Sequence, residues 1–178
     1  MAAKLRWGRG LAVVLLVLAG CGSRPVSAYG SVDVMFAQMS LAYIDQGERV
    51  LGPVVERAAD AKLRVLAVEL REQWRAEAQT MQSWLSAWGQ SAAADPGPEA
   101  HAGHGELHSL RDADLAELTA ATDFDGTATR LLLGHLHNCV AVSRMEEAGG
   151  KHAAARELAG RMSASRQGQI QRLLTLGR

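Results

Sequence analysis

The feature of this 178-residue chain that most limits its possible folds is an internal repeat with an offset of 92 residues. Segments 33–85 and 125–177 share one order without a gap: an aspartate, a helical apolar pattern, a break and a second helical pattern. This order predicts two helical hairpins, which would bury their apolar faces by packing as a four-helix bundle with approximate twofold symmetry. The identical pairs are Asp33/Asp125, Leu41/Leu133, Val50/Val142, Ala61/Ala153, Arg64/Arg156, Leu66/Leu158, Ala67/Ala159 and Gln79/Gln171.

Apolar residues recur at helical spacing in each half, and no segment shows the alternation that is typical of a strand. The expected fold class is therefore all-α, with halves at 33–89 and 123–177. Aspartates precede three of the helical patterns and are the expected N-caps, because a carboxylate accepts from free N–H groups of the first turn. These aspartates are Asp33, Asp60 and Asp125.

The connector between the halves, residues 90–122, predicts a long loop and one short helix. Glycine and proline are frequent in its first part, which favours a loop. Asp112 or Asp114 is the expected start of the short helix, which would end near Ala121. In the first half, Pro53 is expected to bend the first helix.

The start of the chain has the pattern of a secretory signal peptide, with basic residues followed by a short apolar run. This run, Leu11 to Leu18, is too short to span a bilayer, which requires roughly 20 apolar residues. It continues into Ala19-Gly20-Cys21, which resembles the bacterial lipobox, so we expect cleavage of residues 1–20 and lipidation of Cys21. Residues 21–32 predict a flexible tether. An ordinary signal peptide beside an unrelated cysteine is the alternative.

Charge and cysteine content exclude some classes of protein. Cleavage after residue 20 would leave 16 basic and 19 acidic residues with no basic patch, so nucleic-acid binding is not expected. Residues 33–178 are enough for one domain with a hydrophobic core. Cys139 would have no intrachain partner after lipidation of Cys21, so we predict a small buried side chain rather than a disulfide.

Several motifs of the repeat carry a family resemblance. Segment 33–39 (DVMFAQM) is followed by Leu66-Ala67 and then by Glu77, Met81, Trp84 and Leu85; the second half has Phe124-Asp125 and segment 132–143. Together these resemble the domain of unknown function 305 family over residues 33–177. The resemblance implies a duplicated, ferritin-like four-helix bundle that is usually exported. It further implies a Met-x-x-His-His motif on the first helix of each half and a Gln-x-x-Glu-Ile-x-x-Met type motif on the second. Some relatives are associated with copper or silver.

The chain departs from that pattern at the paired histidines, where it has Tyr43-Ile44 and His135-Leu136. On the second helices it keeps Glu77 but has Gln169 at the matching place, so the four symmetry-related positions hold Tyr43, Glu77, His135 and Gln169. One imidazole and one carboxylate form a poor set of ligands for a transition metal. A phenol, a carboxylate, an imidazole and an amide can instead satisfy one another's donors and acceptors. We therefore predict a buried polar cluster that sets the helix register, with residual metal binding as the alternative.

Three histidines in the connector form a second constellation, His101, His104 and His108 in the segment HAGHGELH. Their spacing could bring three imidazoles to one ion if the segment became helical. The glycines favour a solvated loop, because ordering the loop would cost binding free energy. A copper or zinc site of these histidines with His135 remains the alternative to a protein without a cofactor.

Patterns of common enzymes are missing from the sequence, which has no nucleophile elbow, phosphate loop or HExxH motif. Adjacent acids such as Glu146 and Glu147 are interpreted as solvated faces. Trp74, Trp84 and Trp88 share helical spacing; core packing is the favoured interpretation, and a partner-binding stripe at the outer end of the bundle is the alternative.

The sequence thus predicts a non-enzymatic binding or scaffold protein at the cell envelope, attached to the membrane through its lipid and without a specified protein partner. One rival is a protein that buffers copper or zinc. Another is a ferritin-like oxidase, which would need carboxylates and histidines from several helices.

Overall fold

The computed structural model describes residues 28–93 and 110–176. The expected leader, Cys21 and the three connector histidines lie outside these residues. The described part contains helices and no strand, which confirms the all-α fold class. None of these helices combines the length and the apolar character that a membrane crossing requires. The helices are α1 (Ser31–Arg57), α2 (Ala61–Ala87), α3 (Asp112–Ala120), α4 (Phe124–Gly149) and α5 (Ala153–Leu176).

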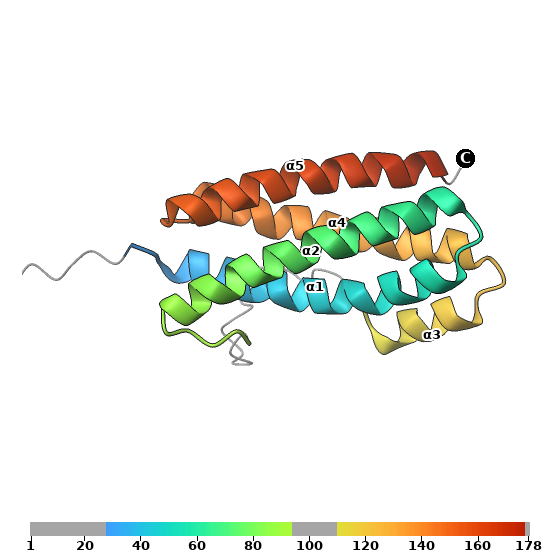
Figure 1. Ribbon diagram of the computed structural model, residues 1–178, viewed down its shortest axis with the longest axis horizontal. Coiled ribbons are helices and arrows are strands. Elements are labelled where there is room, and N and C mark those ends of the chain that lie inside the picture. Colours follow the sequence, from blue (N-terminus) through green and yellow to red (C-terminus); the bar gives the residue numbers. More distant parts are fainter. Residues whose placement is uncertain (1–27, 94–109, 177–178) are drawn as a thin grey trace, which may run out of the picture.

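Four long helices lie side by side as two hairpins, α1–α2 and α4–α5 (Figure 1). Helix α1 packs extensively against α2 and α4, and α4 packs against α5. Contact between α2 and α5 is much sparser, so these two helices form the loosest side of the bundle. The short helix α3 lies against α4.

Of the three aspartates expected to be N-caps, one caps its helix in the structure. The Asp60 carboxylate caps α2, accepting from the N–H groups of Lys62 at 2.7 Å and Leu63 at 3.4 Å. The expected caps Asp33 and Asp125 are wrong, because α1 begins at Ser31 after Gly30 and α4 begins at Phe124 after Asp123. Both aspartates bind the opposite hairpin, and Asp33, at the third position of α1, also accepts from the Gly30 N–H at 2.5 Å.

Asp125, at the start of α4, accepts hydrogen bonds from the turn between α1 and α2. Its carboxylate oxygens lie 3.1 Å from the Ala59 nitrogen and 2.7 Å from the Asp60 nitrogen. A carboxylate that accepts from two N–H groups forms charge-assisted hydrogen bonds, which are stronger than neutral ones. Asp125 therefore joins the second hairpin to the turn of the first.

Asp33, at the equivalent position of the first half, makes the symmetric contact. It accepts from Lys151 at 3.0 Å and from His152 at 2.7 Å, in the turn between α4 and α5. These donors follow the Asp125 donors by the same 92 residues. Hydrogen bonds from the backbone lower the pKa of Asp33 against the effect of its burial. The sequence repeat is thus visible as a repeated joint between the hairpins.

Glu146 lies beside Asp33 and corrects the interpretation of the Glu146-Glu147 pair as a solvated face. Its side chain is fully buried, with 0% exposure, because this turn of α4 faces the start of α1. Burial and the neighbouring Asp33 carboxylate raise the pKa of Glu146 to about 8. Glu146 is therefore mainly protonated at neutral pH, and Glu147 alone is exposed.

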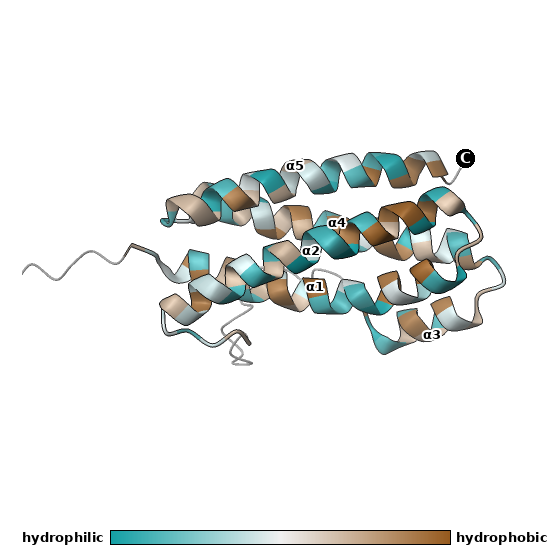
Figure 2. Cartoon of the chain, in the orientation of Figure 1, coloured by the Kyte–Doolittle hydropathy of each residue, from teal (hydrophilic) through white to brown (hydrophobic). Residues whose placement is uncertain are grey.

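The core consists of two apolar clusters, one toward each end of the bundle. Hydrophobic and hydrophilic residues alternate along the long helices, as expected for amphipathic helices around a core (Figure 2). One cluster includes Leu66, Leu70 and Leu132. The other includes Phe36 and Met81. On α2, α4 and α5, buried polar residues lie between the parts that belong to the two clusters.

Candidate functional site

Each long helix contributes one of the four polar residues singled out in the sequence. Tyr43 comes from α1, Glu77 from α2, His135 from α4 and Gln169 from α5, and all four side chains are buried. The structure thus places them in the middle of the bundle. They divide into two groups that differ in their contacts.

Glu77 and Gln169 are linked through a residue that the sequence did not single out, Gln73. The Gln73 amide nitrogen donates to the Glu77 carboxylate at 2.9 Å, and the Gln169 amide nitrogen donates to the Gln73 amide oxygen at 2.8 Å. Gln73 also exchanges hydrogen bonds with Ser165, at 2.9 and 3.1 Å. Since Ser165 follows Gln73 by 92 residues, equivalent positions of the two halves meet here between α2 and α5.

Tyr43 and His135 form the second group and meet through their rings. The ring centroids are 5.8 Å apart in an edge-on arrangement. The His135 imidazole also lies 5.5 Å from the Trp74 ring, and its Nε2 atom lies 3.8 Å from the Cys139 sulfur. Cys139 is buried, as expected for a small core residue. The four residues are therefore neighbours in the core rather than one closed ring of hydrogen bonds.

Arg166 is the residue that joins the two groups, and sequence reasoning missed it. Its guanidinium forms an ion pair with Glu77, with the two side chains 1% and 7% exposed, and lies 5.5 Å from the centre of the Trp74 ring. A signal existed in the sequence, because Arg166 lies four residues after Met162 and four before Ile170, on the inward face of α5.

The Arg166–Glu77 ion pair supplies the charges of this cluster, because the other titratable side chains in it are held neutral at pH 7. Burial, followed by the effect of Arg166, lowers the pKa of His135 to about 4, so the imidazole is neutral at pH 7. Burial raises the pKa of the Cys139 thiol to about 11 and that of Tyr43 to about 12. Burial also raises the pKa of Glu77, while its ion pair with Arg166 acts in the opposite direction.

Gly47 of α1 allows the rings of the cluster to approach the helix backbone. A Cβ atom at this position would lie 2.7 Å from the Nε2 atom of His135 and closer still to the Trp74 ring. Real Cβ atoms do not approach other atoms so closely. Gly47 therefore holds the space into which these two side chains fit.

Residues 33–176 match the model of the family described as domain of unknown function (DUF305). The chain belongs to the DUF305 family. Solved structures agree with this assignment, although their identities are low enough to show only the fold. Comparison with curated proteins finds no match.

Three solved structures illustrate the fold that this chain shares with other proteins. A DUF305 fragment from Deinococcus radiodurans is 22% identical, with a TM-score of 0.70 over 83% of this chain and 96% of the other. A DUF305 protein from Streptomyces coelicolor, described as a candidate secreted protein, is 20% identical, with a TM-score of 0.75 over 82% and 91%. CopM in its Cu(II)-bound form is 19% identical, with a TM-score of 0.70 over 81% and 94%.

The core of this DUF305 chain does not fit a metal ion. Among the described residues, no three side chains of His, Cys, Asp or Glu are grouped closely enough to hold one. His135 and Cys139 are adjacent, but the Glu77 carboxylate is already paired with Arg166. Two nitrogens of Arg166, Nε and Nη1, and Nε1 of Trp74 are buried without an acceptor in the described parts. These donors and the fixed positive charge would repel a cation.

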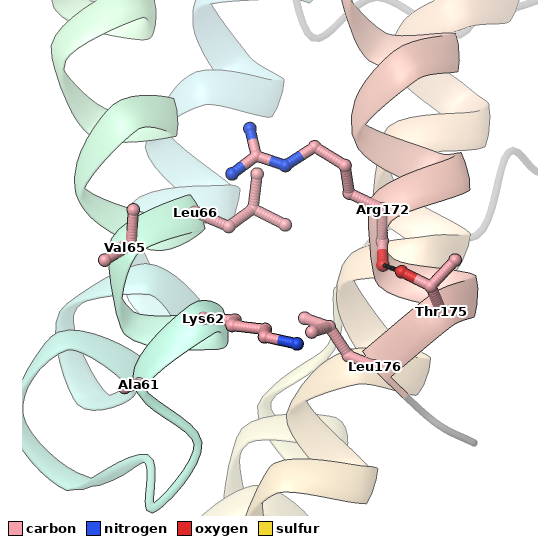
Figure 3. Close-up of a pocket in the computed structure, with 7 residues that line it drawn as sticks. All are labelled: Ala61, Lys62, Val65, Leu66, Arg172, Thr175 and Leu176. Atoms are coloured by element: carbon pink, nitrogen blue, oxygen red, sulfur yellow. Dashed lines mark hydrogen bonds between the residues drawn. The ribbon is translucent and has the colours of Figure 1, made fainter.

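A second candidate site in the DUF305 chain is a hollow of about 320 Å³ between the start of α2 and the end of α5 (Figure 3). We call it the α2–α5 hollow. Its wall is mainly apolar, and the cationic side chains of Lys62 and Arg172 reach over it from opposite helices. The hollow coincides with the sparse contact between these helices. Its lining residues are Ala61, Lys62, Val65, Leu66, Arg172, Thr175 and Leu176.

Proposed function

We propose that this DUF305 protein is an extracytoplasmic lipoprotein, anchored to a bacterial membrane through Cys21, with a non-enzymatic binding or scaffold function. The leader followed by Leu18-Ala19-Gly20-Cys21 supports the anchor. The Streptomyces coelicolor relative, as a candidate secreted protein, is in keeping with export. Two or more acyl chains would hold the domain stably on the membrane.

The observation that carries the non-metal part of this proposal is the Arg166–Glu77 ion pair in the core. It places a permanent cation beside the remaining candidate ligands, His135 and Cys139. A buried charge of one sign strongly disfavours a second charge of the same sign nearby. The polar cluster is therefore proposed to be structural, and binding is assigned to the surface of the bundle.

A metal-buffering function is the second candidate, through His101, His104 and His108 with or without His135. It is favoured by the CopM structures with Cu(II), Cu(I) and silver bound. In this alternative the connector histidines would act outside the bundle core, and the Arg166–Glu77 pair would not interfere with them.

Titration of the mature protein with Cu(I), Cu(II) and Zn(II), measured by isothermal titration calorimetry, distinguishes the two functions. The scaffold proposal expects no binding at micromolar or lower metal concentrations. Micromolar binding that is lost on changing His101, His104 and His108 together to alanine would establish metal buffering instead. The exposed His137→Ala variant is the matched control, since it removes one surface histidine outside the candidate set.

The anchor and the absence of enzymatic activity are tested separately. Mass spectrometry of the protein from membranes should find acyl chains on Cys21, and Cys21→Ser should release the protein from the membrane fraction. An unmodified Cys21 would refute the anchor. Oxidase activity after loading with iron or copper would refute the non-enzymatic assignment.

A further inference from the structure

Aromatic side chains gather at the end of the bundle where the described chain begins. Tyr29 stacks on Trp88 with the ring centroids 4.6 Å apart, and Trp88 stacks on Trp84 at 6.2 Å. The His152 ring meets both tryptophans edge-on, at 5.3 Å from Trp84 and 5.2 Å from Trp88. We call these four residues the aromatic end. All four are half-buried, so part of their surface remains in contact with solvent.

The aromatic end combines the segment before α1, the end of α2 and the turn between α4 and α5, which meet at one end of the bundle (Figure 1). The Tyr29 hydroxyl donates to the Trp88 carbonyl at 3.0 Å. Asp33 connects the start of α1 to the turn that carries His152. The incoming chain is therefore attached to this end by side-chain contacts as well as by the start of α1.

The proposed lipid on Cys21 would lie close to this end. Tyr29 follows Cys21 by eight positions, and even a fully extended chain spans only about 29 Å over eight residue steps. The opposite end of the bundle lies about 40 Å further away, because α1 has 27 residues that rise 1.5 Å each. Of the two ends, only the aromatic end is kept near the bilayer by the tether.

We propose that the aromatic end contacts the headgroup region of the bilayer that holds the Cys21 lipid; this inference rests on the lipid anchor proposed above. Tryptophan and tyrosine favour that region because an apolar ring and a polar N–H or O–H group are satisfied there together. Trp84 and Trp88 supply two such rings in one stacked unit. The α2–α5 hollow lies at the start of α2 and the end of α5, which is the opposite end of the bundle. Contact of the aromatic end with the membrane therefore directs the hollow away from the membrane.

After cleavage at Cys21 the protein has three tryptophans, Trp74, Trp84 and Trp88. Trp74 is buried in the core, so its emission serves as an internal reference for that of the other two. The acylated protein is reconstituted into vesicles of phosphatidylethanolamine and phosphatidylglycerol, with or without lipids brominated near the headgroup. Bromine quenches tryptophan emission at short range. We expect brominated lipid to remove the larger part of the emission of Trp84 and Trp88, and to leave Trp74 unaffected.

Three variants make the test specific. The double variant Trp84→Phe and Trp88→Phe keeps only Trp74 and should lose the quenching. Tyr29→Ala should reduce the quenching, because it removes the stacking and the hydrogen bond to Trp88 that fix the chain at this end. Circular dichroism of each variant reports whether the bundle is folded, and Gln90→Ala, an exposed position beside the aromatic end, is the matched control.

The outcomes distinguish this inference from the anchor. Quenching that disappears in the double variant supports the contact. Acylated Cys21 without quenching overturns the contact and leaves the anchor standing, in which case the aromatic end would be available to a protein partner. Equal quenching of the wild type and the double variant also overturns it. Unmodified Cys21 overturns both proposals.

Discussion

Replacement of Arg166 by methionine should strongly destabilise the bundle, because it leaves the Glu77 carboxylate buried without its counter-ion. The two side chains are 1% and 7% exposed, so water cannot take over the role of the guanidinium. Breaking a buried ion pair by removing one partner costs about 3–5 kcal/mol. For a domain of this size each kcal/mol lowers the melting temperature by about 2–4 °C, so we expect a decrease of about 6–20 °C.

Urea denaturation followed by circular dichroism measures this loss. Arg172→Met is the matched control: Arg172 comes from the same helix and pairs with Glu69 at 2.5 Å, but both side chains are 49% exposed. An exposed pair contributes at most about 1 kcal/mol. A double variant, Arg166→Met with Glu77→Met, should recover much of the loss, since a buried pair can be replaced by apolar side chains of similar volume.

The reasoning would be refuted if Arg166→Met were as mild as Arg172→Met, or if the double variant lost the sum of the two single losses. Either result would mean that the pair is solvated and that water screens the charge of Arg166 in the core. The argument against a metal ion in the core would then lose its main support.

Three further predictions concern other positions. Raising the pH from about 5 to 8 should destabilise the protein by up to about 1.4 kcal/mol per pH unit, because the pKa of Glu146 is about 8 in the folded protein and 4.5 in the unfolded chain, so only the folded protein keeps this proton. Denaturation curves of Glu146→Gln at several pH values should show a weaker dependence of stability on pH. Asp33→Ala and Asp125→Ala should each lower the free energy of unfolding by about 1–3 kcal/mol, since each variant leaves N–H groups of a turn without an acceptor. Clearly different losses for the two variants would contradict the equivalence of the two joints. Gly47→Ala should destabilise the protein by about 1–3 kcal/mol, because the added Cβ atom clashes with the rings of the core. Gly134→Ala, where a Cβ atom meets nothing within 4 Å, should be neutral or should stabilise the protein by up to about 1 kcal/mol.

Much of the fold could be predicted from local patterns of residues. Helical spacing of apolar residues is a property of a short segment, so the four long helices and the break within each half were visible without tertiary information. The repeat also predicted how the helices pair, because two copies of one amphipathic hairpin must bury similar faces against each other. The cap at Asp60 was likewise local, since its acceptor and donors lie within three residues.

The candidate site could be predicted only in part. The repeat located Tyr43, Glu77, His135 and Gln169 at equivalent positions, and all four are buried in the core. It did not indicate Arg166, because an arginine on a helix is usually interpreted as solvent-exposed, and only the partner helix carrying Glu77 explains its burial.

The sequence by itself determined which segments are helical, how they pair and to which family the chain belongs, because these depend on periodicity and on motifs along the chain. Only the tertiary structure decided which charges are buried. Arg166 and Glu146 lose their water through the approach of residues from other helices, and Asp33 and Asp125 each accept hydrogen bonds from the opposite hairpin. Burial and long-range hydrogen bonds depend on distances between segments that lie far apart in the chain, and no local pattern of residues contains those distances.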